Sequence, residues 1–163
     1  MQNRSTAVQI RESAPADWLA VAGLLAQLGR PDVRGTAEEA EARRVYERYL
    51  ERLDTVALVA EDEGRVIGFL DMEFRTWLNF LTPQAWIPDL VVAEDARGRG
   101  IGAALLARAE ELARARGCWG MTLESATWRE RAHAFYVSQG WKEVARSFSR
   151  VLTDAEWPPA PRP

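Results

Sequence analysis

An apolar run that passes through a glycine-rich turn into an alanine- and leucine-rich segment constrains this chain more than any other feature. The run Leu90–Val92 has the composition of a buried strand, and residues 101–116 carry apolar side chains at helical spacing. Between them Gly98, Gly100 and Gly102 alternate with other residues. Glycine permits positive φ and a close approach to the backbone. The sequence therefore predicts a strand, a tight turn and a helix, as in α/β domains.

The predicted turn has the chemistry of an anion-binding site. The N–H groups of a first helical turn have no intrahelical partner, and the helix dipole adds roughly half a positive charge there. Such an end binds phosphate, and Arg97 and Arg99 add two cationic side chains. Two common phosphate-binding patterns do not fit, because no Lys-Ser/Thr follows these glycines and their spacing is not Gly-x-Gly-x-x-Gly. A glycine-rich turn without a ligand is the alternative interpretation.

Composition limits the remaining classes of function. The 163 residues, 47% of them hydrophobic and 28% charged, suit one globular domain of roughly 150 residues. A net charge of −3 leaves no basic surplus for a nucleic acid, and we expect no such partner. The single cysteine and single histidine exclude an internal disulfide and a Cys/His metal cluster, so no metal is expected. No run approaches the ~20 apolar residues of a membrane helix, and no signal segment is visible, so we expect a cytoplasmic protein without a membrane partner.

Hydrophobic periodicity predicts one α/β domain over residues 1–152 and a proline-rich C-terminal tail over residues 153–163. The predicted order is β-α-α-β-β-β-α-β-α-β-β, and the sheet must be mixed because it contains both hairpins and helical crossovers. The strands are expected at residues 8–11, 55–61, from 66, 86–93, 120–125, 141–145 and 148–152, and the helices from residue 15 or 17, beyond 36, at 101–116 and at 128–138.

Two blocks of the sequence resemble the GNAT superfamily of N-acetyltransferases. The pattern Arg-x-x-Gly-x-Gly at residues 97–102 is similar to the acyl-CoA-binding signature Gln/Arg-x-x-Gly-x-Gly/Ala of that superfamily. The pattern Ala-x-x-x-Tyr-x-x-x-Gly-Trp at residues 132–141 is similar to its Ala-x-x-x-Tyr-x-x-x-Gly-Phe helix and strand. The order and separation of the blocks also match, so the resemblance covers about residues 8–152. It implies a GNAT-type mixed β-sheet flanked by helices, and acetyl-CoA as co-substrate.

The resemblance also implies which residues bind CoA. The strand before the glycines pairs with the pantetheine arm as an added strand does, and the backbone amides of residues 98–103 hold the pyrophosphate. Arg129 stands where many members have an asparagine, seven residues before the family tyrosine, and offers a cation for a phosphate. Pro88 fits a bulge beside the pantetheine strand. The expected cofactor-binding residues are Leu90, Val91, Val92, Arg97, Gly98, Arg99, Gly100, Ile101, Gly102, Ala103 and Arg129.

Transfer of an acetyl group from a thioester to an amine needs a base for the ammonium and an acid for the leaving thiolate. Tyr136 matches the family tyrosine that lies near the CoA sulfur and is the expected acid. Glu124, predicted on a strand that faces a cleft where burial would raise its pKa, is slightly favoured as the base. Asp89, beside the pantetheine strand, is the other candidate. Asp71 and Glu73 are interpreted as exposed side chains of an amphipathic strand, with attraction of a cationic amine as the alternative.

The sequence thus predicts an N-acetyltransferase that moves acetyl from acetyl-CoA to a primary amine, on a small molecule or a peptide, by direct attack in a ternary complex. One alternative is a non-catalytic acetyl-CoA-binding regulatory module, which would bind the cofactor without turnover. Another is the same fold with a different acyl group, or with a protein N-terminus as acceptor. Trp77, Phe80 and Trp86 are assigned to core packing, with an acceptor pocket or a homodimer contact as alternatives.

Overall fold

The structure is a computed structural model that describes residues 8–152 of the chain. The chain divides into two compact units, Met1–Leu123 and Glu124–Pro163, which are described separately. The predicted tail lies outside the described residues, and a single domain over residues 1–152 stays a prediction. No helix within residues 8–152 has both the length and the apolar composition to span a membrane.

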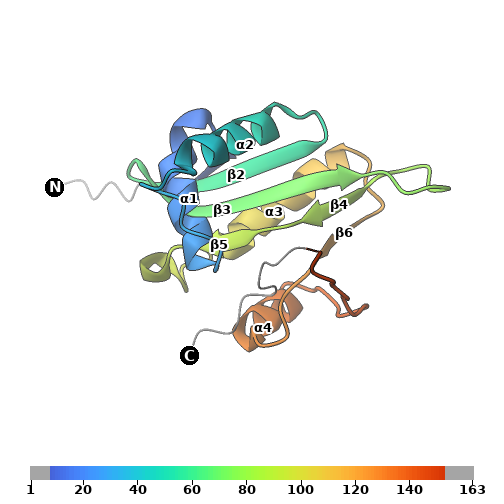
Figure 1. Cartoon of the computed structure of the whole chain (residues 1–163). Helices are drawn as coiled ribbons and strands as arrows, with labels where there is room; N and C mark the ends of the chain where they lie inside the picture. The colour runs from blue at the N-terminus through green and yellow to red at the C-terminus, as the bar shows by residue number, and fades with distance from the viewer. Residues whose placement is uncertain (1–7, 153–163) are drawn as a thin grey trace. The chain divides into compact units, whose positions relative to one another are not determined.

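The first unit combines a six-stranded sheet with three α-helices in the part that the structure describes (Figure 1). Short 3-10 turns at Pro15–Asp17 and Glu94–Ala96 precede the first and third helices. The elements are β1 (Gln9–Glu12), α1 (Trp18–Gln27), α2 (Glu39–Glu51), β2 (Thr55–Asp62), β3 (Arg65–Arg75), β4 (Gln84–Ile87), β5 (Leu90–Val92), α3 (Ile101–Ala115) and β6 (Gly120–Leu123).

The strands form a mixed sheet, as the sequence predicts. Its order is β1-β2-β3-β4-β6, and β5 pairs with β3 beside this path. The strand pairs are antiparallel except β4 with β6, which is parallel. A parallel pair needs a crossover, and α3 supplies it between β5 and β6. The observed architecture therefore confirms the predicted α/β class with a mixed sheet flanked by helices.

Helices cover both faces of the central strand β3. Figure 1 shows α1 and α2 over one face of the sheet and α3 over the other. The face toward α3 is tightly packed, because a Cβ atom added at Gly68 would lie 3.1 Å from both Ile101 and Leu105. Leu70 and Met72, on the same face of β3 as Gly68, have no exposed surface. The glycine thus lets the α3 helix approach the sheet closely.

Gly68→Val is expected to lower the free energy of unfolding by about 1–3 kcal/mol, because its methyl groups would overpack the contact between α3 and β3. Gly120→Val is the matched control, since a Cβ atom there meets no heavy atom within 4 Å. We expect the control to change stability by about 0.5 kcal/mol or less. Urea denaturation of both variants measures the difference. Equal destabilisation would contradict the close packing.

The predicted strand 86–93 is divided into two. β4 pairs with the end of β3 and with β6, whereas β5 pairs with residues 68–70 of β3. At the break, Pro88 lacks an N–H group, and the Asp89 N–H donates to Asp71 Oδ1 at 2.8 Å. The Asp71 N–H donates to the Asp89 carbonyl at 3.2 Å. A side-chain acceptor therefore replaces one bond of the ladder, and β5 separates from the strand that continues the sheet.

The second unit contains the helix α4 (Glu130–Ser138), which begins two residues later than predicted. The strands predicted at 141–145 and 148–152 are wrong, because the structure describes no strand there. Three apolar residues of these two runs remain exposed: Val144, Phe148 and Leu152 keep 85%, 92% and 88% of their surface. A strand requires a ladder partner, and an apolar run in the sequence does not supply one.

Candidate functional site

The strand β5 presents one open edge. On its paired edge, Leu90, Val91 and Val92 lie opposite Leu70, Phe69 and Gly68 of β3. Within residues 8–152, β5 has no strand partner on its other edge. Unpaired ladder groups of this kind bind an extended ligand as an added strand.

The turn after β5 presents backbone N–H groups at the start of α3. Gly98 and Gly100 have φ values of 77° and 78°, in the left-handed region. Gly100 is the N-cap, and its carbonyl accepts the first helical bond from the Ala104 N–H at 3.0 Å. The N–H groups of residues 101–103 therefore lie in the first turn, without intrahelical partners. A Cβ atom added at Gly98 or Gly100 meets nothing within 4 Å, so the glycine backbones face open space.

The two arginines of this turn already have partners. Arg99 Nη2 lies 2.7 Å from Asp62 Oδ2 at the end of β2. Arg97 Nε donates to the Val92 carbonyl at 3.3 Å, and its Nη2 lies 4.0 Å from Glu94. Both guanidinium groups are about half exposed, so an anion at the turn can compete for them. The sequence correctly places two cations at this turn but does not predict their pairing.

Asp89, one of the two expected bases, is held in an ion pair. Its Oδ1 accepts bonds from Arg30 Nη2 at 2.8 Å and Nε at 3.2 Å. The Asp89 side chain is only 13% exposed. The pair therefore fixes the loop after α1 to the junction between β4 and β5.

Asp71 differs from the expectation of an exposed side chain. It lies on the face of β3 that α1 contacts, and it is half-buried. Burial, followed by the negative charge of Asp89, raises the pKa of Asp71 to about 7, and Glu73 adds to the effect. The sequence contains a signal of this burial, because apolar and polar residues do not alternate over residues 66–70. Such a run is typical of a strand that is covered on both faces.

Tyr49 of α2 adjoins this carboxylate. Its hydroxyl is buried and makes no hydrogen bond of ordinary geometry in the described structure. Burial raises the pKa of Tyr49 above its usual range, and the charges of Asp71 and Glu73 act in the same direction. The Arg52 guanidinium lies 5.5 Å from the centre of the Tyr49 ring and 3.4 Å from Glu73 Oε1. Tyr49 and Glu73 are thus ionisable neighbours of Asp71, and Arg52 contacts both of them.

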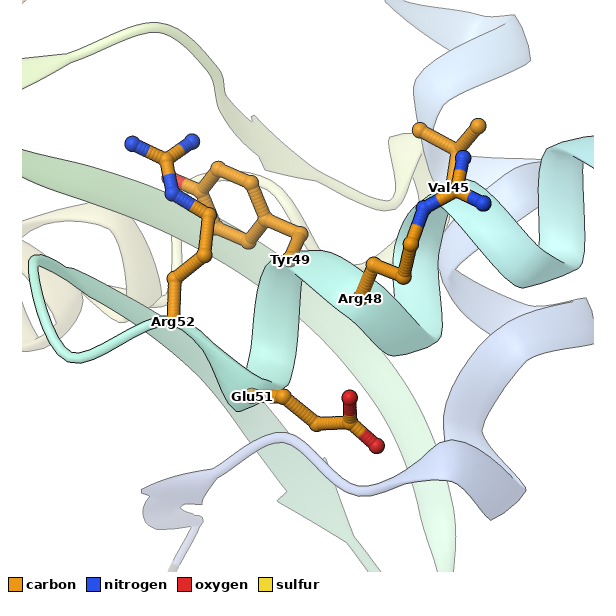
Figure 2. Close-up of a pocket in the computed structure, with 5 residues that line it drawn as sticks. All are labelled: Val45, Arg48, Tyr49, Glu51 and Arg52. Atoms are coloured by element: carbon orange, nitrogen blue, oxygen red, sulfur yellow. The ribbon is translucent and has the colours of Figure 1, made fainter.

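A surface pocket of about 510 Å³ lies over the C-terminal half of α2. Figure 2 shows the Arg52 guanidinium above the Tyr49 ring, with Glu51 pointing away from that ring. Arg48 and Arg52 contribute two cationic side chains to the pocket, and the Tyr49 ring forms one of its walls. The lining residues are Val45, Arg48, Tyr49, Glu51 and Arg52.

Three of the predicted residues belong to the second unit. Tyr136 lies on α4, half-buried, with its ring centre 5.4 Å from Phe135 and 6.2 Å from Trp141, and burial raises its pKa. Arg129 is the N-cap of α4. Glu124 is exposed and follows the last residue of β6, so it is not the strand side chain that the sequence predicts.

Of the three aromatic residues assigned to the core, Trp86 is half-buried under the Arg75 guanidinium, whereas Trp77 and Phe80 lie in an exposed cluster with Trp119. The ring of Phe80 stacks on Trp119 at 5.5 Å, and Trp77 meets both rings edge-on. Trp77, Phe80 and Trp119 keep 46%, 48% and 50% of their surface. These side chains lie in the β3–β4 connection and just before β6, where no helix covers them in the described part of the chain.

Comparisons with known proteins agree with this arrangement. The uncharacterized N-acetyltransferase YhfO of Bacillus subtilis is 29% identical over 137 residues, covering 83% of this chain and 91% of that protein. The aminoalkylphosphonate N-acetyltransferase of Salmonella typhimurium is 35% identical over 89 residues, covering 55% of this chain and 58% of that protein. The solved structure of a putative acetyltransferase from Agrobacterium tumefaciens superposes with a TM-score of 0.79 and 26% identity, covering 88% of this chain and 99% of that one.

The profile of the acetyltransferase (GNAT) family matches residues 24–141, which include both the open strand and the glycine turn. The match extends over most of the chain and agrees with the mixed sheet found in the structure. The chain therefore belongs to the acetyltransferase (GNAT) family and is an acetyl-CoA-dependent N-acetyltransferase.

Proposed function

We propose that this enzyme transfers acetyl from acetyl-CoA to the primary amine of a small molecule, by direct attack within a ternary complex. One observation carries the proposal: the open edge of β5 leads directly into the turn of residues 98–103 with its unpartnered N–H groups. An extended, hydrogen-bonding arm followed by a diphosphate is the chemistry of CoA, and these two surfaces complement it. The Salmonella relative, named for an aminoalkylphosphonate, supports a small amine as the acceptor.

The proposed cofactor contacts follow from the same surfaces. The backbone of residues 90–92 pairs with pantetheine, and the amides of residues 98–103 hold the pyrophosphate. Arg97 and Arg99 exchange their present partners for oxygens of the pyrophosphate, which is doubly charged and accepts strong hydrogen bonds from guanidinium groups. Arg129 is proposed as a further phosphate contact from its place in the sequence motif alone.

The direction of the cofactor follows from its two ends. With the pyrophosphate at Gly100, the pantetheine arm runs along β5 from Val92 toward Leu90. The thioester then reaches the junction of β4 and β5 at Pro88 and Asp89. An acceptor amine must approach this junction, and the protein contributes by orienting the two substrates and excluding competing water.

The reaction moves protons at two places, the attacking nitrogen and the departing sulfur. The ammonium of the acceptor loses a proton to a carboxylate, for which the sequence offers Glu124 and Asp89. The freed nitrogen forms a bond to the thioester carbon, and the C–S bond then breaks. The thiolate takes a proton from the Tyr136 hydroxyl, which we propose on the evidence of the sequence motif. The tyrosinate regains a proton from the nitrogen, which must lose a second one to become an amide.

Tyr136→Phe is expected to lower kcat by about 10²-fold, the lower end of the usual contribution of a general acid. The affinity for acetyl-CoA should stay within about twofold, because the ring and its packing remain. Stopped-flow detection of the free thiol gives kcat, and calorimetry gives the affinity. Full activity at every pH would remove Tyr136 from the mechanism.

The decisive experiment measures thiol release from acetyl-CoA with a panel of amines. The panel contains aminoalkylphosphonates, aminoglycosides, polyamines and peptides with a free N-terminus. Turnover with a small amine, and a product whose intact mass has increased by one acetyl group, would support the proposal. Saturable acetyl-CoA binding without turnover on any amine would instead favour the non-catalytic regulatory module.

A further inference from the structure

We propose that Asp71, rather than Glu124 or Asp89, is the general base that takes the proton from the acceptor ammonium. This inference rests on the proposed function, because it requires the thioester to reach the junction of β4 and β5. It assigns a catalytic residue to β3, on the face of the sheet beneath α1 and α2.

The position of Asp71 is fixed by the junction itself. Its N–H donates to the Asp89 carbonyl at 3.2 Å, and its Oδ1 accepts from the Asp89 N–H at 2.8 Å. The preceding residue, Leu70, lies opposite Leu90, the first residue of β5. The carboxyl group is therefore within one residue of the strand end where the proposed arm terminates. One of its oxygens accepts the bond from the Asp89 N–H, and the buried Tyr49 hydroxyl is the other polar neighbour of the carboxyl group.

The ionisable groups around Asp71 come from the β4–β5 junction, from β3 and from α2. Asp89 from the junction and Glu73 from β3 are negative, and Tyr49 of α2 contributes a buried hydroxyl. The nearby cations are bonded to these neighbours: Arg30 to Asp89, and Arg52 to Glu73 and Asp54. Within residues 8–152, Asp71 itself takes part in no ion pair.

This environment suits a base that works near neutral pH. Burial and the negative neighbours raise the pKa of Asp71 to about 7. A base of that strength is ionised for about half of the time at pH 7, and a base performs best when its pKa lies near the working pH. Clusters of carboxyl groups that raise the pKa of one member recur at active sites.

The other two carboxylates are less suited to the step. Asp89 is bonded twice to Arg30, so its Oδ1 already accepts from two N–H donors. Glu124 is exposed and lies after the end of β6.

The step is balanced as a proton transfer followed by acyl transfer. Asp71 takes one proton from the acceptor's R–NH₃⁺ and becomes a neutral carboxylic acid. The amine lone pair forms the N–C bond, the C–S bond breaks, and the electrons of that bond leave on the thiolate, which takes up the second proton that the nitrogen loses as it becomes an amide. Asp71 then loses its proton to water, which restores the charged form for the next turnover.

The test is the pH profile of kcat/KM for Asp71→Asn, measured beside Asp89→Asn and Glu124→Gln. Asparagine keeps an oxygen that accepts the Asp89 N–H, so the junction and the affinity for acetyl-CoA should stay within about twofold. We expect at least a ~10²-fold lower rate at pH 7. The acidic limb of the wild-type profile, with an apparent pKa near 7, should disappear in this variant alone.

Each outcome decides the assignment. The inference is overturned if Asp71→Asn keeps the acidic limb, if Glu124→Gln or Asp89→Asn removes it, or if Asp71→Asn fails to bind acetyl-CoA. A wild-type profile without an acidic limb near pH 7 overturns it without any variant. In these cases wild-type turnover of an amine leaves the proposed function standing. Absence of turnover on every amine refutes the proposed function, and the inference fails with it.

Discussion

Gly100→Ala is expected to weaken acetyl-CoA binding at least tenfold while the protein still folds. Gly100 is the N-cap of α3, and a Cβ atom there meets no heavy atom of the protein within 4 Å. The space in front of it is where we propose the pyrophosphate, so the added methyl group displaces the anion from the amides. A tenfold loss corresponds to about 1.4 kcal/mol of binding free energy.

Gly117→Ala is the matched control for this substitution. The φ values of Gly100 and Gly117 are 78° and 75°, and neither position has a heavy atom within 4 Å of an added Cβ. Each variant should lose about 1–2 kcal/mol of stability, because alanine is strained in the left-handed region. Calorimetric titration with CoA separates the two, since only Gly100 lies at the proposed phosphate site. Equal CoA affinity in both variants would show that the phosphates bind elsewhere.

Asp71→Asn is expected to stabilise the protein above pH 7, although the same substitution should reduce activity. The folded protein raises the pKa of Asp71 from 3.8 to about 7. Below about pH 4 the carboxyl group is neutral in both the folded and unfolded states, and no penalty arises. Between about pH 4 and pH 7 the unfolded chain ionises this group while the folded protein keeps it neutral, so stability falls, and the full cost is present above pH 7. Asparagine removes this cost, which reaches up to about 4 kcal/mol at 1.36 kcal/mol for each pKa unit.

Urea denaturation of the wild type and of Asp71→Asn at pH 5 and pH 8 measures this effect. The advantage of the variant should be larger at pH 8. Asp95→Asn provides a control of opposite sign, because Arg65 lies 2.7 Å from this exposed carboxylate and lowers its pKa. The Asp95 variant should gain no stability on going from pH 5 to pH 8. An Asp71→Asn protein that is no more stable than the wild type at pH 8 would refute the expected cost.

Local features of the chain were predictable from sequence. Contacts and burial that depend on distant parts of the chain were not. The strand, turn and helix around Gly98 and Gly100 depend on residues close together in the chain, and the structure contains all three. The pairing of Arg99 with Asp62 joins residues far apart in sequence, and no local pattern specifies it. Asp71 was misassigned for the same reason, because its burial depends on helices that precede it in the chain.

The predictions of strands at 141–145 and 148–152 are wrong for a related reason. The pattern of apolar residues in a run indicates which side chains would share a face if a strand formed. It does not report whether a neighbouring strand is present to pair with it. The break at Pro88 was foreseen as a bulge, but its replacement bond comes from the Asp71 side chain on another strand.

The shortness of β5 has a consequence for the protein in the absence of its cofactor. A long exposed edge would invite intermolecular pairing and aggregation, and natural sheets avoid this with short edge strands, proline and charged side chains. β5 has three residues, with Pro88 two positions before its first residue and Glu94 two positions after its last. An edge of this kind is long enough for a thin, flexible cofactor arm and too short to template a neighbouring polypeptide. The edge that we propose for pantetheine is thus open without the usual risk of self-assembly through strand pairing.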